Sequence, residues 1–234
     1  MARLMFALLL LVGAFNCSAR EYTQQEMDDW FNAPPEPSAA DVNEGELAFL
    51  SRQPAKRVHH HHNVLTLSDQ TVLDGWGELR QCHANLDRVP ATQIVFREDR
   101  IRDLRIVSST GIESSSVEGA TVQLKQVGPG AKICVALKSK VLYLQPDGTY
   151  HIANGPFMRK FLDGYYPMHV SMEVIVKSKK LIFHDITPNK QVGFKVSIQP
   201  KLIIFDAWFK GRLNTLIRFK TMPLVLNKRF PLHS

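Results

Sequence analysis

Short runs in which polar and apolar residues alternate fill most of the chain after residue 58. Every second side chain is apolar in residues 170–176, and residues 121–124 and 194–198 repeat the pattern. A period of two residues is typical of β-strands that bury one face. Further strands are expected at residues 93–97, 102–107, 133–137, 141–144, 181–186, 202–208 and 213–219.

Turn-forming residues separate these segments, for example Gly-Pro-Gly at 128–130 and Pro-Asp-Gly at 146–148. No long helical period lies between the strands, which favours an antiparallel arrangement over a parallel sheet with crossover helices. We therefore expect a mainly β fold, either one antiparallel β-sandwich or two packed β subdomains, with a short helical insertion. Lys210-Gly211 is expected to form a hairpin turn. Residues 74–87 fit either a short helix or a strand.

The first nineteen residues are typical of an export signal. Arg3 precedes an apolar run over residues 4–13, and Cys-Ser-Ala at 17–19 suits a signal peptidase. The run is too short for a membrane span, which needs roughly twenty apolar residues. We expect residues 1–19 to be a signal peptide and the mature chain, with no transmembrane segment, to be periplasmic or, as the alternative, secreted.

Charge divides the rest of the chain into two parts. Residues 20–50 contain eight acidic residues against Arg20 alone, and prolines interrupt this stretch at 34, 35 and 37. Residues 51–234 contain 27 Lys and Arg against 14 Asp and Glu. We expect an acidic flexible leader over residues 20–57, a basic β-sandwich-like domain over 58–226 and a C-terminal tail over 227–234.

Two cysteines remain after removal of the signal, Cys82 and Cys134. Disulfides form and persist outside the cytosol, so we expect these two to be bonded. Closing a loop of this length contributes about 4 kcal/mol on a simple chain-entropy account. Two metal-binding thiols are the alternative, which the lack of any Cys-x-x-Cys pair disfavours.

Four consecutive histidines, His59, His60, His61 and His62, are the most unusual chemical feature of the sequence. Imidazoles bind copper or zinc, but an extended tract directs only two side chains to each face. A stronger site needs another histidine, and the candidates are His83, His151, His169 and His184. The alternative is a solvated, pH-responsive beginning of the first strand. No other cofactor is expected.

Basic residues form a second candidate site, an anionic-partner surface. It comprises Arg97, Arg100, Arg102, Arg105, Lys177, Lys179 and Lys180. The sequence contains no nucleic-acid recognition module, so the expected partners are anionic lipid, acidic glycan or an acidic envelope protein. A solubilising outer face of the sandwich is the alternative.

Residues 155–167 form a third candidate, rich in aromatic and basic side chains and bounded by glycine and proline. We expect one or two helical turns here, which either dock on a membrane or partner or plug one end of the sandwich. The plug is favoured, with Phe157, Phe161 and Tyr165 buried, and the cations of this segment are Arg159 and Lys160.

Enzymatic motifs such as a Gly-x-Ser-x-Gly elbow or a phosphate-binding glycine loop do not occur in the sequence. No catalytic residue is therefore assigned. The sequence favours an exported, non-enzymatic binding or assembly protein of the cell envelope that engages an anionic ligand or a protein partner through its basic domain. A periplasmic copper- or zinc-binding protein and a hydrolase of unrecognised family remain as alternatives.

Overall fold

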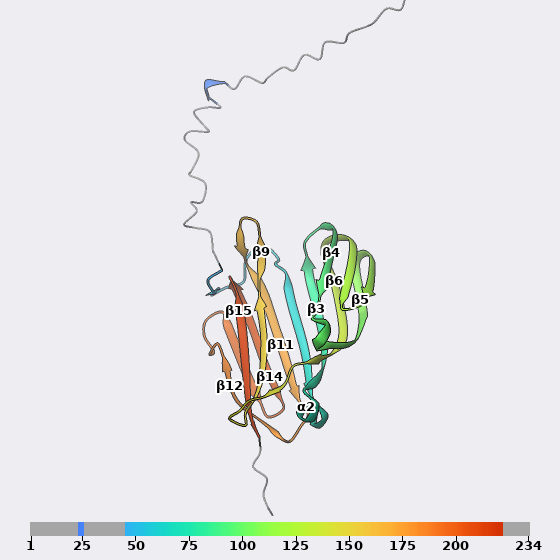
Figure 1. Cartoon of the computed structure of the whole chain (residues 1–234). Helices are drawn as coiled ribbons and strands as arrows, with labels where there is room; N and C mark the ends of the chain where they lie inside the picture. The colour runs from blue at the N-terminus through green and yellow to red at the C-terminus, as the bar shows by residue number, and fades with distance from the viewer. Residues whose placement is uncertain (1–22, 26–44, 222–234) are drawn as a thin grey trace, which may run out of the picture. The chain divides into compact units, whose positions relative to one another are not determined.

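The computed structural model describes residues 23–25 and 45–221 (Figure 1). Residues 45–221 lie within one compact unit. The expected signal peptide 1–19, the tail 227–234 and most of the leader lie outside the described residues. Residues 23–25 and 45–57 of the leader are described, and the second range includes β1, which pairs with a strand of the domain. The β domain therefore begins before Val58.

A nine-stranded sheet and a four-stranded sheet dominate the fold, which confirms the mainly β prediction. The path through the larger sheet is β1 (Ala48–Phe49), β14 (Leu202–Lys210), β11 (Met168–Val176), β2 (His60–Leu67), β3 (Trp76–Leu86), β6 (Thr121–Lys140) and β4 (Val89–Val95), with β13 (Phe194–Gln199) on β14 and β5 (Ile101–Glu118) on β6. The smaller sheet has the order β12 (Leu181–Thr187), β15 (Leu213–Thr221), β8 (Tyr150–Phe157) and β7 (Tyr143–Leu144). Strands β2 and β11 run parallel, and every other strand pair in the described part of the chain is antiparallel.

The two sheets pack face to face around the larger hydrophobic core. In β11, five alternate residues from Met168 to Val176 are buried, as the period-two pattern predicts. They contact side chains such as Phe205 of β14 and, from the opposing sheet, Ile217 and Phe219 of β15. Each of these three is at most 1% exposed, so the core is closed to water.

A second, smaller core lies in the lobe formed by β3, β4, β5 and β6, which stands beside the sandwich in Figure 1. The first half of β6, residues 121–127, pairs with β4, and its second half, residues 131–140, pairs with β3. Strand β5 pairs along both halves. The glycines expected to make a turn at 128–130 instead lie inside β6, between its two paired halves.

One short α-helix, α2 (Asp69–Asp74), connects β2 and β3, and a 3-10 turn, η2 (Glu98–Arg100), precedes β5. Ser68 caps α2 through a capping box with Thr71, and Gly75 ends the helix in a left-handed conformation. Residues 76–86, which fit either a helix or a strand in the sequence, form β3.

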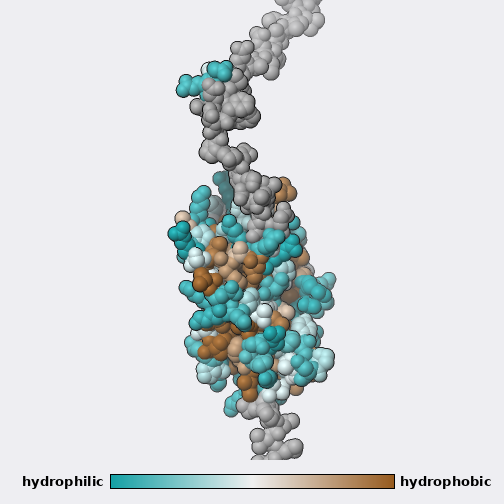
Figure 2. Space-filling model, turned by 90° about the vertical axis from the view of Figure 1, so that its left-hand side faces the viewer, coloured by the Kyte–Doolittle hydropathy of each residue, from teal (hydrophilic) through white to brown (hydrophobic). Residues whose placement is uncertain are grey.

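The predicted hairpin at Lys210-Gly211 is wrong, because β14 and β15 belong to different sheets. Gly211 lies where the chain crosses from one layer to the other. A Cβ atom there would meet the carbonyl of Glu46, and the φ of +85° also favours glycine. On the face shown in Figure 2, apolar side chains lie in separate groups among hydrophilic ones.

Candidate functional site

The histidine tract leads into β2 and divides between the two faces of the larger sheet, as alternation predicts. His60 and His62 lie on the outer face, where His169 of β11 is the register partner of His60. His59 and His61 lie on the inner face, where His83 of β3 contacts both. We call these groups the outer histidines (His60, His62, His169) and the inner histidines (His59, His61, His83).

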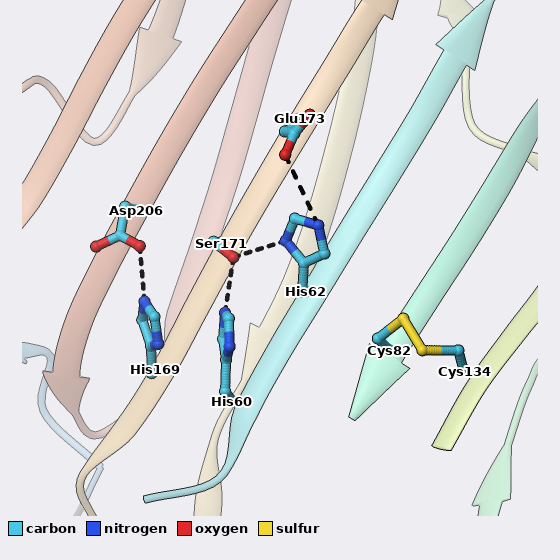
Figure 3. Close-up of polar contacts among 8 residues, drawn as sticks. All are labelled: His60, His62, Cys82, Cys134, His169, Ser171, Glu173 and Asp206. Atoms are coloured by element: carbon cyan, nitrogen blue, oxygen red, sulfur yellow. Dashed lines mark hydrogen bonds and ion pairs between the residues drawn. A yellow bond between two sulfur atoms is a disulfide. The ribbon is translucent and has the colours of Figure 1, made fainter. Parts of the chain in front are cut away.

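A row of stacked rings crosses three strands on the outer face. His169 stacks on His60 with ring centroids 3.8 Å apart and on Trp208 of β14 with centroids 3.9 Å apart. His169 Nε2 donates to the Asp206 carboxylate at 2.6 Å (Figure 3). Burial raises the pKa of Asp206, but the hydrogen bond and charge of His169 outweigh it, so the pKa is lowered overall. The ring of His169 is thus held on both faces and at one nitrogen.

Ser171 bridges the other two outer histidines. Its Oγ lies 2.7 Å from His60 Nε2 and 2.8 Å from His62 Nδ1, as Figure 3 shows. Glu173 lies on the far side of His62, with its carboxylate 3.8 Å from Nε2. A hydroxyl has one proton, so Ser171 donates to one imidazole and accepts from the other. Burial first, and then the nearby His169 and His62, lower the pKa of His60 to about 4.

The inner histidines belong to a chain of neutral side chains. The Gln81 amide donates to His83 Nε2 at 2.7 Å, which leaves His83 Nδ1 to donate to His59 Nε2 at 3.0 Å. His61 Nε2 lies 3.0 Å from Asn63 Oδ1. Burial lowers the pKa values of His59 and His61 to about 4 and that of His83 well below 6.5. All three are therefore uncharged at neutral pH.

A ready-made metal centre is not among these groups, because no set of three or more His, Cys, Asp or Glu in the described residues could hold a metal ion. The rings of His60 and His169 are 15° from parallel, so their lone pairs do not converge. The nitrogens of His60 and His62 do converge, on the Ser171 hydroxyl. The other two candidate histidines lie on the smaller sheet, where His151 contacts Thr149 and His184 lies beside Asp185.

The predicted disulfide between Cys82 and Cys134 is confirmed. The two cysteines are directly opposite on β3 and β6, with Cα atoms 4.1 Å apart, and His62 is the register partner of Cys82 on the other side. A bond of this kind is typical of oxidising compartments outside the cytosol.

The basic residues expected to form one surface have different surroundings. Arg97 is occupied by two hydrogen bonds to Asp99, and Arg102 lies 3.9 Å over the Trp76 ring. Arg100 follows Asp99 in η2, 5.5 Å from the Tyr143 ring centroid. Lys177, Lys179 and Lys180 are exposed in the connection between β11 and β12.

Arg105 and Arg80 line a groove of about 310 Å³ on the outer face. Arg80 was not among the basic residues predicted from the sequence. Arg80 of β3 and Arg105 of β5 are both register partners of Ala136 in β6, one from each side. We call this feature the arginine groove. At its end Lys138 pairs with Asp103 at 3.4 Å. Neither arginine forms an ion pair with any residue that the structure describes.

The helical turns expected within residues 155–167 are wrong, since this segment forms a hairpin of β9 (Arg159–Phe161) and β10 (Gly164–Tyr166). Aromatic side chains on both strands suit extended backbone better than a helix. Phe157 and Tyr165 are 8% exposed, as a plug requires, but Phe161 is 43% exposed.

Hydrogen bonds attach this hairpin to its neighbours. Arg159 donates to both carboxylate oxygens of Asp87, and Arg212 donates to the Tyr165 hydroxyl at 2.9 Å. Lys160 lies 5.5 Å from the Tyr165 ring centroid. The base of the hairpin is thus held to the sandwich, while Leu162 at its tip is fully exposed.

Comparison with protein-family models and with curated proteins finds no match to this chain. Among the described residues, no helix has the length and apolar character needed to cross a membrane.

Proposed function

We propose that this protein is an exported, non-enzymatic binding protein of the cell envelope, periplasmic by location, whose β domain holds an anionic group in the arginine groove. The single observation that carries the proposal is the placement of Arg80 and Arg105 on either side of Ala136. The expected signal peptide and the disulfide support the location.

The geometry suits an anion because the small side chain of Ala136 leaves space between two long cations. Adjacent strands are about 4.8 Å apart, so the two arginine Cα atoms are roughly 10 Å apart. Guanidinium groups recognise phosphate, sulfate and carboxylate through paired N–H donors. An arriving anion does not have to displace a bound carboxylate from either arginine.

Two sources in an envelope supply such a group, lipid headgroups and acidic glycans. The test uses purified mature protein with phosphatidylglycerol vesicles and with polygalacturonate, against phosphatidylcholine vesicles and dextran as uncharged comparisons. Arg80→Gln and Arg105→Gln are each expected to weaken binding about tenfold, since a hydrogen bond to a charged group is worth about 1.5–3 kcal/mol. Binding to the vesicles indicates a lipid headgroup, and binding to polygalacturonate indicates an acidic glycan.

The matched control is Arg97→Gln, which removes the same charge from an arginine already paired with Asp99. It is expected to retain binding. Equal losses for Arg97→Gln and Arg105→Gln would show that only net charge matters, and failure of every anionic probe at low salt would reject the function.

Copper or zinc binding at the outer face is the second candidate, and the convergence of His60 and His62 nitrogens on Ser171 favours it. A metal would replace the hydroxyl as their shared partner. Titration with zinc is expected to show weaker binding for His60→Ala and His62→Ala and undiminished binding for Ser171→Ala. Unchanged binding in both histidine variants would exclude this site.

A further inference from the structure

We propose that the cleft between the two sheets binds a small organic acid, with the apolar part of the ligand inside and its carboxylate at Arg100. The cleft has a volume of about 220 Å³ and is lined by strands of both sheets and by η2. It brings together one residue from each sequence-predicted group, His61, Arg100 and Phe157.

The walls of the cleft are apolar. Leu65 of β2 and Met172 of β11 are at most 1% exposed, and Phe157 of β8 closes the side formed by the smaller sheet. Clefts that bind small molecules combine such walls with a few placed polar groups. Because this volume lies below the usual range of about 300–1,000 Å³, the ligand is expected to be small.

The deep end is polar but uncharged. His61 is neutral, Asn63 binds it through Oδ1, and Gln81 is 8% exposed. Among the described residues, the Asn63 amide nitrogen has no hydrogen-bond partner, and no fully buried side-chain nitrogen or oxygen is unsatisfied. Asn63 lines the cleft, and its amide N–H group can donate to a neutral polar atom there. A second charge on the ligand would be unfavourable at this depth.

The mouth is cationic. Arg100 is exposed and Lys140 is half-buried. Arg100 forms no ion pair within the described residues. The ammonium group of Lys140 lies outside the cleft, since Nζ donates to the Asp74 carbonyl at 2.7 Å and lies 5.7 Å from the Trp76 ring centroid. The charge of Arg100 is thus available to a carboxylate at the surface, next to the hydroxyl-bearing ring of Tyr143. Charge complementarity selects an acid over its neutral amide.

This site does not depend on the arginine groove, because the lining residues of the two features overlap only at Leu79. The substitutions Arg80→Gln and Arg105→Gln test the proposed function and do not alter the cleft. The two proposals can therefore fail separately.

The test is calorimetric titration of the mature protein with benzoate, with benzamide as the neutral probe. Benzoate is expected to bind at least tenfold more tightly than benzamide, and Arg100→Gln is expected to remove that preference. Arg97→Gln, three residues from Arg100 and outside the cleft, is the matched control and is expected to bind benzoate normally.

Thermal unfolding of each variant confirms that it is folded before titration. NMR chemical-shift changes on adding benzoate are expected at Asn63 and Met172. Absence of benzoate binding, equal affinity for benzamide, or chemical-shift changes that exclude Asn63 and Met172 would each overturn the proposal.

Discussion

Cys82 and Cys134 are directly opposite each other on β3 and β6, two residues along from Arg80 and Ala136 on the same strands. The disulfide therefore joins the two strands that form one side of the arginine groove. The disulfide and the groove lie on the same outer face. The stability of the lobe and the geometry of the proposed binding site therefore depend on the same pair of strands.

Replacing both cysteines by serine is expected to lower the free energy of unfolding by about 4 kcal/mol, because the bond closes a sequence separation of 52 residues. Urea denaturation of the double variant and of the oxidised parent measures the difference. Addition of a reductant should destabilise the parent and leave the variant unchanged. Equal stability of the two oxidised samples would contradict a structural role for the bond.

Ala136→Leu is expected to weaken binding of the anionic probe about tenfold or more without changing any charge. The larger side chain would occupy the space between the two guanidinium groups. Ala91→Leu, at an exposed position on β4, adds the same atoms elsewhere and should bind normally. Normal binding by Ala136→Leu would show that the space between the arginines is not used.

Acidification is expected to destabilise the fold between about pH 6.5 and 4. Burial lowers the pKa values of His59 and His61 from 6.5 to about 4, so in this window the unfolded chain holds more protons than the folded one. Stability is complete above pH 6.5 and decreases as the pH falls, by at most about 1.4 kcal/mol per pH unit for each histidine.

Urea denaturation at pH 7 and pH 5 measures this dependence. His61→Gln should reduce the difference between the two pH values. A free energy of unfolding that is equal at both pH values would be inconsistent with neutral inner histidines.

Tyr165→Phe is expected to cost about 1 kcal/mol of stability, because it leaves Arg212 without the hydroxyl that accepts its hydrogen bond. Tyr166→Phe removes a hydroxyl from the exposed side of the same hairpin and should cost less. Thermal and urea unfolding compare the two variants. A larger loss for Tyr166→Phe would mean that the hairpin is held by its exposed face.

Local pattern was sufficient for much of the fold. The alternation in residues 168–176 determines which side chains of β11 enter the core, and the same period separates the outer from the inner histidines. It could not separate a hairpin from a crossing between layers at Gly211, since both place two strands around a short turn. The helix α2 could have been found from Ser68, Thr71 and Gly75, which are a typical cap and stop.

The candidate sites depended on register, which local pattern does not contain. Arg80 and Arg105 are 25 positions apart, and only the pairing of β3 and β5 with β6 brings both to Ala136. His169 joins His60 through a parallel pairing of strands more than 100 positions apart. Sequence reasoning supplied the residue types for these groups but not their neighbours.

That parallel pairing also has a consequence for the order of assembly. The lobe from β3 to β6 is continuous in sequence and ends at Lys140. Strand β2 pairs with β3 on one side and gains its second partner, β11, only when residues 168–176 have been synthesised. Contacts between distant segments form slowly because the intervening chain must first be closed into a loop. A chain made from its amino end is therefore expected to complete the lobe first. The sandwich closes last, when β11 pairs with the free edge of β2.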